Sequence, residues 1–189
     1  THLPDCLATD RHTVQFRRSA SCWLDVDAFE ELEALGEAAS LAAAVELYRG
    51  DFLEGLYLEG CPEYEIWAVG KRERWRQRVE QALESLIAHH TGLDEYERGL
   101  DFARRLLALE PWREGTHRQM MLLLARSGQR GAALAQYETC CRVLAAELNV
   151  EPAEETTALY ERISALALTR CQNLPAQPRS FVGRDEELA

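Results

Sequence analysis

Positive charge is scarce in this sequence, and lysine is almost absent. Only Lys71 is a lysine among the 21 basic residues, and the rest are arginine, a bias that we interpret as the codon usage of a GC-rich genome. Against 32 acidic residues the formal net charge is −11. A chain with this balance should repel nucleic acid as a whole rather than bind it.

The usual signatures of metal, disulfide and membrane proteins are also missing. The six cysteines show no CxxC spacing, and the adjacent Cys140 and Cys141 would point about 100° apart on a helix, which suits neither a shared metal nor a mutual bridge. We therefore expect reduced thiols and a cytoplasmic protein. No apolar run of about 20 residues and no signal peptide are present, so we expect no membrane partner.

No pattern in the sequence predicts catalysis, a cofactor or a metal. His89, His90 and His117 have no carboxylate or cysteine at metal-ligand spacing. A phosphate loop is excluded at Gly70 and Lys71, because Arg72 stands where a serine or threonine is needed and the segment is predicted to be mid-helix. We expect a protein that is not an enzyme.

Helical patterns dominate what is present. With 47% hydrophobic and 28% charged residues, the chain can build a core, and its length suits one helical domain with tails. We expect about seven helices, with a small hairpin before them. The first helix is predicted to start at a capping box formed by Asp27 and Glu30, and the fourth at a cap formed by Asp94 and Glu97. The predicted segments begin near Asp27, run over 40–48 and from Pro62 to about His90, and then lie at 94–110, 114–127, 132–148 and 153–170.

A period of 34 residues organises the second half of the chain. The segment Gly99–Pro111 can be laid over Ala132–Ala145, and this shift brings Gly99 onto Ala133. The period, the small residues and the closing proline are typical of the tetratricopeptide repeat, in which small residues let neighbouring helix pairs approach. Gly128 lies where the turn between the two helices of a repeat needs a positive φ. The sequence predicts an all-α, tetratricopeptide-like superhelix.

For two segments the sequence does not decide by itself whether the side chains are buried, exposed to solvent or in contact with a partner. The loop between the second and third helices contains Phe52, Leu56 and Tyr57, which we expect to be buried across the helices. The cluster from Lys71 to Arg78 is the one concentration of basic residues. It fits a solvated helix face with i,i+4 pairs, or alternatively a docking patch for an acidic partner or the DNA backbone.

A peptide groove is the usual use of such a repeat. The residues predicted to face its concave side are Arg104, Arg118, Leu122 and Arg126. Binding of a C-terminal carboxylate, the best-known case, needs asparagine and lysine at fixed positions of the first helix. The only two asparagines, Asn149 and Asn173, lie outside that array, so the sequence argues against a chaperone-type adaptor.

Four segments of the sequence are characteristic of one family: Leu24–Leu32, Leu47–Leu56, Leu106–Glu138 and Glu147–Thr156. They resemble the bacterial transcriptional activator domain found in Streptomyces antibiotic regulatory protein-type regulators. In that family a winged-helix DNA-binding domain precedes tetratricopeptide-like helices, so the resemblance implies that residues 1–20 are the C-terminal hairpin of such a domain. It assigns residues 21–170 to the activator domain.

Residues 171–189 are predicted to be a Pro-rich linker and the start of another domain. The segment Phe181–Leu188 resembles the entry of signal-transducing NTPase modules of the nucleotide-binding apoptosis/resistance class. We therefore expect a regulatory domain that relays between an upstream DNA-binding domain and a downstream sensor NTPase. Its partners would be neighbouring domains, another protein or a second copy, with DNA bound only through the upstream domain. The alternative is a free-standing adaptor that binds a peptide or partner helix.

Overall fold

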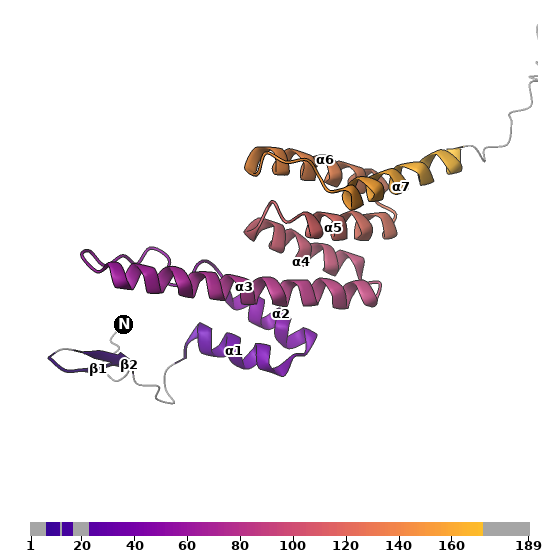
Figure 1. The fold of residues 1–189 in the computed structure, drawn as a ribbon. Coiled ribbons are helices and arrows are strands. Elements are labelled where there is room, and N and C mark those ends of the chain that lie inside the picture. Colours follow the sequence, from indigo (N-terminus) through magenta and orange to yellow (C-terminus); the bar gives the residue numbers. More distant parts are fainter. Residues whose placement is uncertain (1–6, 12, 17–22, 172–189) are drawn as a thin grey trace, which may run out of the picture. The chain divides into compact units, whose positions relative to one another are not determined.

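The structure, a computed structural model, describes residues 7–11, 13–16 and 23–171. The segment Phe181–Leu188 and parts of the predicted N-terminal segment 1–20 lie outside the described residues. Within them the prediction of an all-α domain with seven helices is confirmed (Figure 1). The helices are α1 Asp25–Leu35, α2 Ala38–Leu47, α3 Pro62–Gly92, α4 Tyr96–Leu109, α5 Glu114–Arg126, α6 Arg130–Glu147 and α7 Glu154–Cys171.

The chain divides into two compact units, Thr1–Pro111 and Trp112–Ala189. In the first unit, α1 packs on α2, α2 on α3, and α3 on α4. Two short strands, β1 Leu7–Thr9 and β2 Val14–Phe16, precede these helices and pair antiparallel. The hydrogen bond from Asp10 N to Thr13 O (2.9 Å) closes the turn between them.

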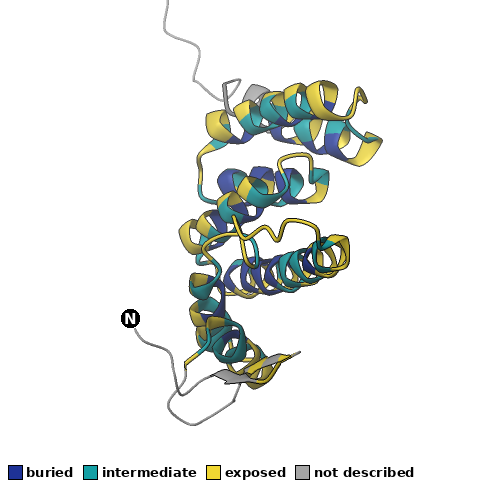
Figure 2. Ribbon diagram, turned by 90° about the vertical axis from the view of Figure 1, so that its left-hand side faces the viewer, coloured by how far each residue is buried: buried dark blue, intermediate teal, exposed yellow. Residues whose placement is uncertain are grey.

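The long helix α3 has different surroundings along its length. It begins at Pro62, whose missing N–H costs nothing at a helix start, with Glu63 and Glu65 in the first turn. At 1.5 Å per residue its 31 residues span about 46 Å, whereas the 14 residues of α4 span about 21 Å. Because α3 is much longer than α4, only part of α3 is well buried (Figure 2). Among the described residues, the buried side chains of α3 are Ala68 near its start and then Val79, Glu80, Ala82, Leu83, Leu86, Ile87 and His90.

Two predicted helix starts need correction. Helix α1 begins at Asp25, and Leu24 is its N-cap without a side-chain cap, so the expected capping box at Asp27 and Glu30 is wrong. The Asp25 carboxylate instead accepts a hydrogen bond from Val26 N at 2.8 Å. Helix α4 likewise starts at Tyr96, and its N-cap Glu95 makes no side-chain cap. In both cases the helix begins where packing starts rather than where a capping residue stands.

Equivalent backbone geometry recurs 34 residues apart. Helices α3 and α5 end at Gly92 and Arg126, and helices α4 and α6 begin at Tyr96 and Arg130. The two turns also carry equivalent left-handed residues. One is Asp94 with φ 57°, and the other is Gly128 with φ 82°. The positive φ predicted at Gly128 is therefore confirmed. Aspartate is among the residues that tolerate this conformation best after glycine, which explains its place in the first turn.

The second unit consists of α5, α6 and α7. Helix α5 packs on α6, and α7 contacts both of them. The rings of Tyr137 and Tyr160 stack with centroids 4.3 Å apart, joining α6 to α7. Arg130 adds hydrogen bonds to the carbonyl oxygens of Ile163 and Ser164. The buried side chains of α5 and α6 are Thr116, His117, Met120, Met121, Leu123, Leu124, Ala133, Cys140 and Leu144.

Two glycines of this unit separate backbone strain from crowding. A Cβ at Gly128 or at Gly131 would have no atom within 4 Å, but only Gly128 has a positive φ. We expect Gly128→Ala to lower the free energy of unfolding by about 1 kcal/mol. Gly131→Ala, its matched control in α6, should raise stability by about 0.4–1 kcal/mol because it restricts the unfolded chain. Urea unfolding measures both. Equal effects of the two substitutions would contradict the positive φ.

Crowding should dominate at the small residues brought into register by the 34-residue shift. Gly99 and Ala133 are both buried. We expect Ala133→Leu to destabilise the protein by about 1–3 kcal/mol, because a larger side chain forces its neighbours apart. Leucine at Gly99 should act in the same way. The adjacent and exposed Ala132 is the control, since Ala132→Leu adds the same atoms to solvent. Thermal unfolding that leaves Ala133→Leu and Ala132→Leu equally stable would show the register to be wrong.

Candidate interaction surface

The four predicted groove residues fall in different units. Arg104 lies on α4 in the first unit, where it is exposed and pairs with Asp101 (Nη1 to Oδ1, 2.6 Å). The other three lie on α5 at four-residue intervals, so they share one face of that helix. Arg126 is exposed and Leu122 is 38% exposed. That these residues line one groove stays a prediction.

Arg118 has a role that the sequence did not reveal. Its Nη1 donates to Thr156 Oγ1 on α7 at 3.0 Å, and it lies 3.7 Å from the Glu114 carboxylate. Glu114 also accepts hydrogen bonds from Ala153 N (2.8 Å) and from Thr156 Oγ1. A carboxylate of α5 thus satisfies a backbone N–H at the start of α7, where helix N–H groups have no partner of their own. These polar residues fasten α7 to α5.

Several arginines of the basic cluster on α3 make contacts that were not expected from the sequence. Arg72 donates to the carbonyl oxygens of Phe52 (2.9 Å) and Leu53 (3.1 Å) in the loop after α2. Arg76 pairs with Asp51 at 3.1 Å in the same loop. These bonds connect residues about 20 positions apart in the sequence, rather than i,i+4 neighbours. The cluster therefore fixes the loop to α3.

Arg78 completes the cluster by joining α3 to α1. It donates to Glu30 Oε1 (2.6 Å) and to Glu33, and its guanidinium lies over the rings of Trp75 (4.5 Å) and Phe29 (5.5 Å). The two rings meet edge to face at 5.5 Å. The hydrogen bond with Glu33 raises the pKa of Arg78 above its usual range, although burial alone would lower it. The cation is satisfied on all sides and has little capacity left for DNA.

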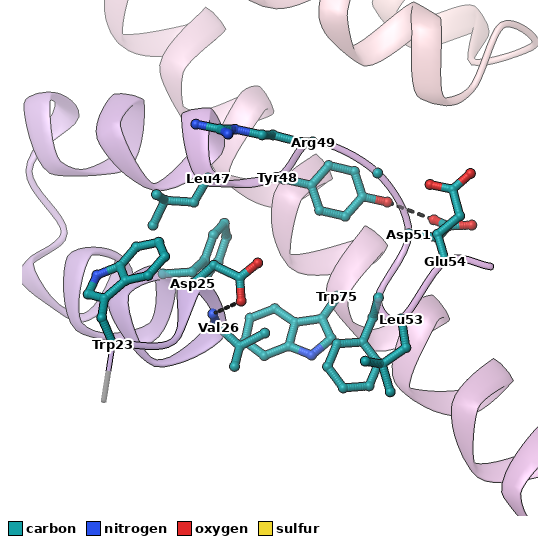
Figure 3. A pocket seen from close by; sticks show the side chains of 13 residues that line it. Trp23, Asp25, Val26, Leu47, Tyr48, Arg49, Asp51, Leu53, Glu54 and Trp75 are labelled. Atoms are coloured by element: carbon teal, nitrogen blue, oxygen red, sulfur yellow. Dashed lines mark hydrogen bonds between the residues drawn. The ribbon is translucent and has the colours of Figure 1, made fainter. Parts of the chain in front are cut away.

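A cavity of about 570 Å³ lies between these contacts in the first unit (Figure 3). Its walls come from the start of α1, the end of α2, the loop after it and Trp75 of α3. Two polar side chains of its wall, Tyr48 and Asp51, are paired with each other. Tyr48 donates from its hydroxyl to Asp51 Oδ1 at 2.8 Å, and Arg76 holds the same carboxylate. Arg49 and Glu54 also line the cavity, beside apolar side chains that include Phe29 and Trp75.

These contacts shift the pKa values of the pair at the cavity wall. Burial, followed by the hydrogen bond to Asp51, raises the pKa of Tyr48 to about 12. Burial alone would raise the pKa of Asp51, but the hydrogen bonds from Tyr48 and Arg76 lower it below its usual value. At neutral pH the pair is therefore a neutral phenol donating to a carboxylate.

The loop after α2 is where burial was predicted wrongly. Phe52 is half-buried and meets Trp67 edge-on at 5.8 Å, but Leu56 is 45% exposed and Tyr57 is 72% exposed. The start of α3 does not cover them. Seven of the fourteen exposed large apolar side chains among the described residues lie within residues 53–69. We call them the apolar patch: Leu53, Leu56, Tyr57, Leu58, Ile66, Trp67 and Val69.

The histidines form ordinary helix contacts together with one pair that the sequence did not predict. His90 Nδ1 lies 2.7 Å from Glu95 Oε2, and its ring stacks on Phe102 at 5.4 Å. The hydrogen bond from His90 lowers the pKa of Glu95. His117 Nδ1 lies 2.7 Å from Gln136 Nε2. Within residues 7–11, 13–16 and 23–171, no group of three His, Cys, Asp or Glu side chains could hold a metal ion.

The seven described helices form an α-helical domain, and sequence comparison identifies its family. The family profile of the bacterial transcriptional activator domain matches residues 24–164. Since this match covers well over half of the chain, the protein belongs to that family. It is similar to the regulatory protein AfsR of Streptomyces coelicolor, with 29% identity over 203 aligned residues that cover 96% of this chain. The chain spans about a fifth (20%) of the length of that relative. No described helix is both long and apolar enough to cross a lipid bilayer.

The phenol–carboxylate pair gives a pH prediction. A tyrosine whose pKa is raised on folding contributes stability that is complete below its unfolded pKa of about 10 and is lost as the pH rises towards 12. Urea unfolding of the native protein and of Tyr48→Phe at a series of pH values isolates this residue. We expect the difference between them to be constant from pH 7 to about 9 and to shift against the native protein between about 10 and 12. A difference that stays constant to pH 12 would contradict the hydrogen bond to Asp51.

Proposed function

We propose that this chain is the regulatory domain of a transcriptional activator. It relays between an upstream DNA-binding domain and a downstream sensor NTPase by changing its contacts with them or with a second copy. The observation that carries this proposal is the match of the activator-domain family to residues 24–164. The regulatory character of that family favours a role without catalysis.

The proposal includes a tetratricopeptide-like arrangement of the helices and a winged-helix origin for the hairpin. The first rests on the 34-residue offset between the ends of α3 and α5, and on the positive φ values of Asp94 and Gly128 at equivalent turns. The second rests on the position of strands β1 and β2 directly before the matched residues. Similarity to AfsR along 96% of this chain, which spans only 20% of that relative's length, supports the presence of neighbouring domains.

Charge supports placing DNA recognition outside this chain. The net charge is −11, and a protein gains affinity for DNA by neutralising phosphates with free cations. The strongest basic cluster has three of its arginines in contacts within the first unit, through Arg72, Arg76 and Arg78. Repositioning them to bind phosphates would release α3 from α1 and from the loop.

A free-standing adaptor is the second candidate function. The observation that favours it is the exposed part of α5, where Leu122 and Arg126 lie one turn apart beyond the contacts of Arg118 with α7. A peptide carrying an apolar residue and a carboxylate would suit this pair. Such an adaptor needs no DNA-binding neighbour.

Promoter binding tests the proposed function. Fluorescence anisotropy of labelled promoter DNA would be measured at about 50 mM salt, where phosphate contacts are strongest, with this chain and with a protein that also contains the residues upstream of it in its gene. We expect saturable binding by the longer protein and none by this chain. For the longer protein, the logarithm of the affinity should fall linearly with that of the salt concentration.

The possible outcomes separate the two functions. Salt-sensitive binding by this chain itself would contradict a relay role and return the Lys71–Arg78 cluster to DNA recognition. Absence of binding by both proteins would favour the adaptor. The variant Arg74→Ala tests the remaining exposed arginine of the cluster, and it should leave the affinity of the longer protein unchanged.

A further inference from the structure

The solvent-facing side of the first turns of α3 combines apolar and acidic residues in an unusual way. Ile66 is 75% exposed and Val69 is 58% exposed. On a helix they lie three positions apart and share one face, opposite the buried Ala68. Large aliphatic side chains exposed together in this way are a mark of an interaction site.

Among the described residues of the first unit, no helix buries Ile66 or Val69. Helix α4 is less than half as long as α3, and Phe102 of α4 stacks on His90 near the end of α3. The loop after α2 lies against Trp67 through Phe52, which leaves Ile66 and Val69 untouched by any ring contact among the described residues. The first turns of α3 therefore expose apolar side chains, whereas the residues from Val79 onwards include most of the buried side chains of this helix.

The charged residues within the segment 50–70, which carries the apolar patch, are all acidic. Between residues 50 and 70 the sequence contains five acidic residues and no basic one. Asp51 is held by Arg76. For the other four, Glu54, Glu59, Glu63 and Glu65, the described residues supply no ion pair. Glu63 and Glu65 lie one turn before the exposed apolar residues, so the stripe has carboxylates beside it.

We propose that the apolar patch and its four free carboxylates bind a cationic amphipathic helix, one with an apolar stripe flanked by lysine or arginine. A second copy of this chain is a poor occupant, because self-association through this face would bring two sets of free carboxylates together in a chain of net charge −11. Within the proposed function, on which this inference rests for its biological setting, the patch is the relay's contact with a positively charged neighbouring domain.

Binding of a model helix tests the inference directly. The probe is a fluorescein-labelled amphipathic peptide of about 18 leucine and lysine residues, long enough to form a helix, and the measurement is anisotropy with the whole chain. We expect saturable binding that weakens with added salt. A peptide with glutamate in place of lysine should not bind. Ile66→Ser should weaken binding by at least about tenfold, whereas Leu35→Ser, at a side chain that is 64% exposed on α1, should change it less than twofold.

Two double variants with the same change of net charge distinguish binding at the patch from attraction to the overall negative charge. Glu63→Lys with Glu65→Lys, and Glu154→Lys with Glu155→Lys, change the net charge equally, and both pairs lie in the first turn of a helix. Only the first pair should weaken binding, again by about tenfold. Equal losses in both pairs would mean that the peptide responds to net charge alone and would overturn the site.

Two further outcomes would contradict the proposed binding site. A monomer–dimer equilibrium in sedimentation that Ile66→Ser abolishes, without peptide binding, would show that a second copy covers the patch and would overturn the cationic partner. No DNA is present in these measurements. A failed peptide experiment beside successful promoter binding by the longer protein would therefore remove this site and leave the proposed function intact.

Discussion

The first unit depends on how its arginines are neutralised. Helix α3 is too polar along its middle to be held by burial alone, and its contacts there run through Arg72, Arg76 and Arg78. Exposed ion pairs are individually worth only about 0.2–1 kcal/mol. Arg78 differs, because its side chain is 18% exposed and lies over two aromatic rings. Removing it would leave Glu33 without its partner, which costs more than the pair contributes.

This way of holding α3 explains where the apolar patch comes from. Beyond the turn that carries Arg72, the helix continues towards its start with only Ala68 buried. The backbone oxygens of Phe52 and Leu53 are tied to Arg72, which holds the loop at its backbone rather than by its side chains. Leu53 adopts a positive φ of 51°, a costly conformation for a bulky residue. The loop is thus fixed in a form that leaves Leu56 and Tyr57 in solvent.

Helix number and order could be predicted from the sequence because each helix carries its own signal. The apolar spacing of α3, Pro62 at its start and Gly128 in a turn act locally, within one or two turns of chain. Helix starts were less predictable. The pattern at Asp27 and Glu30 satisfies the capping rule, yet packing of Phe29 against Trp75 keeps the helix going two residues further back.

The arginine contacts could not have been predicted in this way. Arg78 meets Glu33 across 45 residues, and nothing local distinguishes it from Arg74, which stays exposed. The same limit applies to burial in the loop. An apolar sequence such as that around Tyr57 predicts a buried segment only if some other element is available to cover it. Whether another helix covers this loop depends on the tertiary arrangement, which the local sequence does not specify.

The contacts of the second unit leave fewer residues available for the predicted peptide groove. Arg118 was predicted to face a ligand, but in the structure its donor is used by Thr156 of α7, and Glu114 beside it is used by Ala153. Since α7 contacts both α5 and α6, that part of the face already has a helical occupant supplied by the chain itself. A peptide would have to displace α7 to reach Arg118. It could meet Leu122 and Arg126 without doing so, which leaves a contact of two residues on one turn of helix. The first unit offers more apolar surface, within a segment (50–70) whose charged residues are all acidic. For that reason the stronger case for a partner lies on α3.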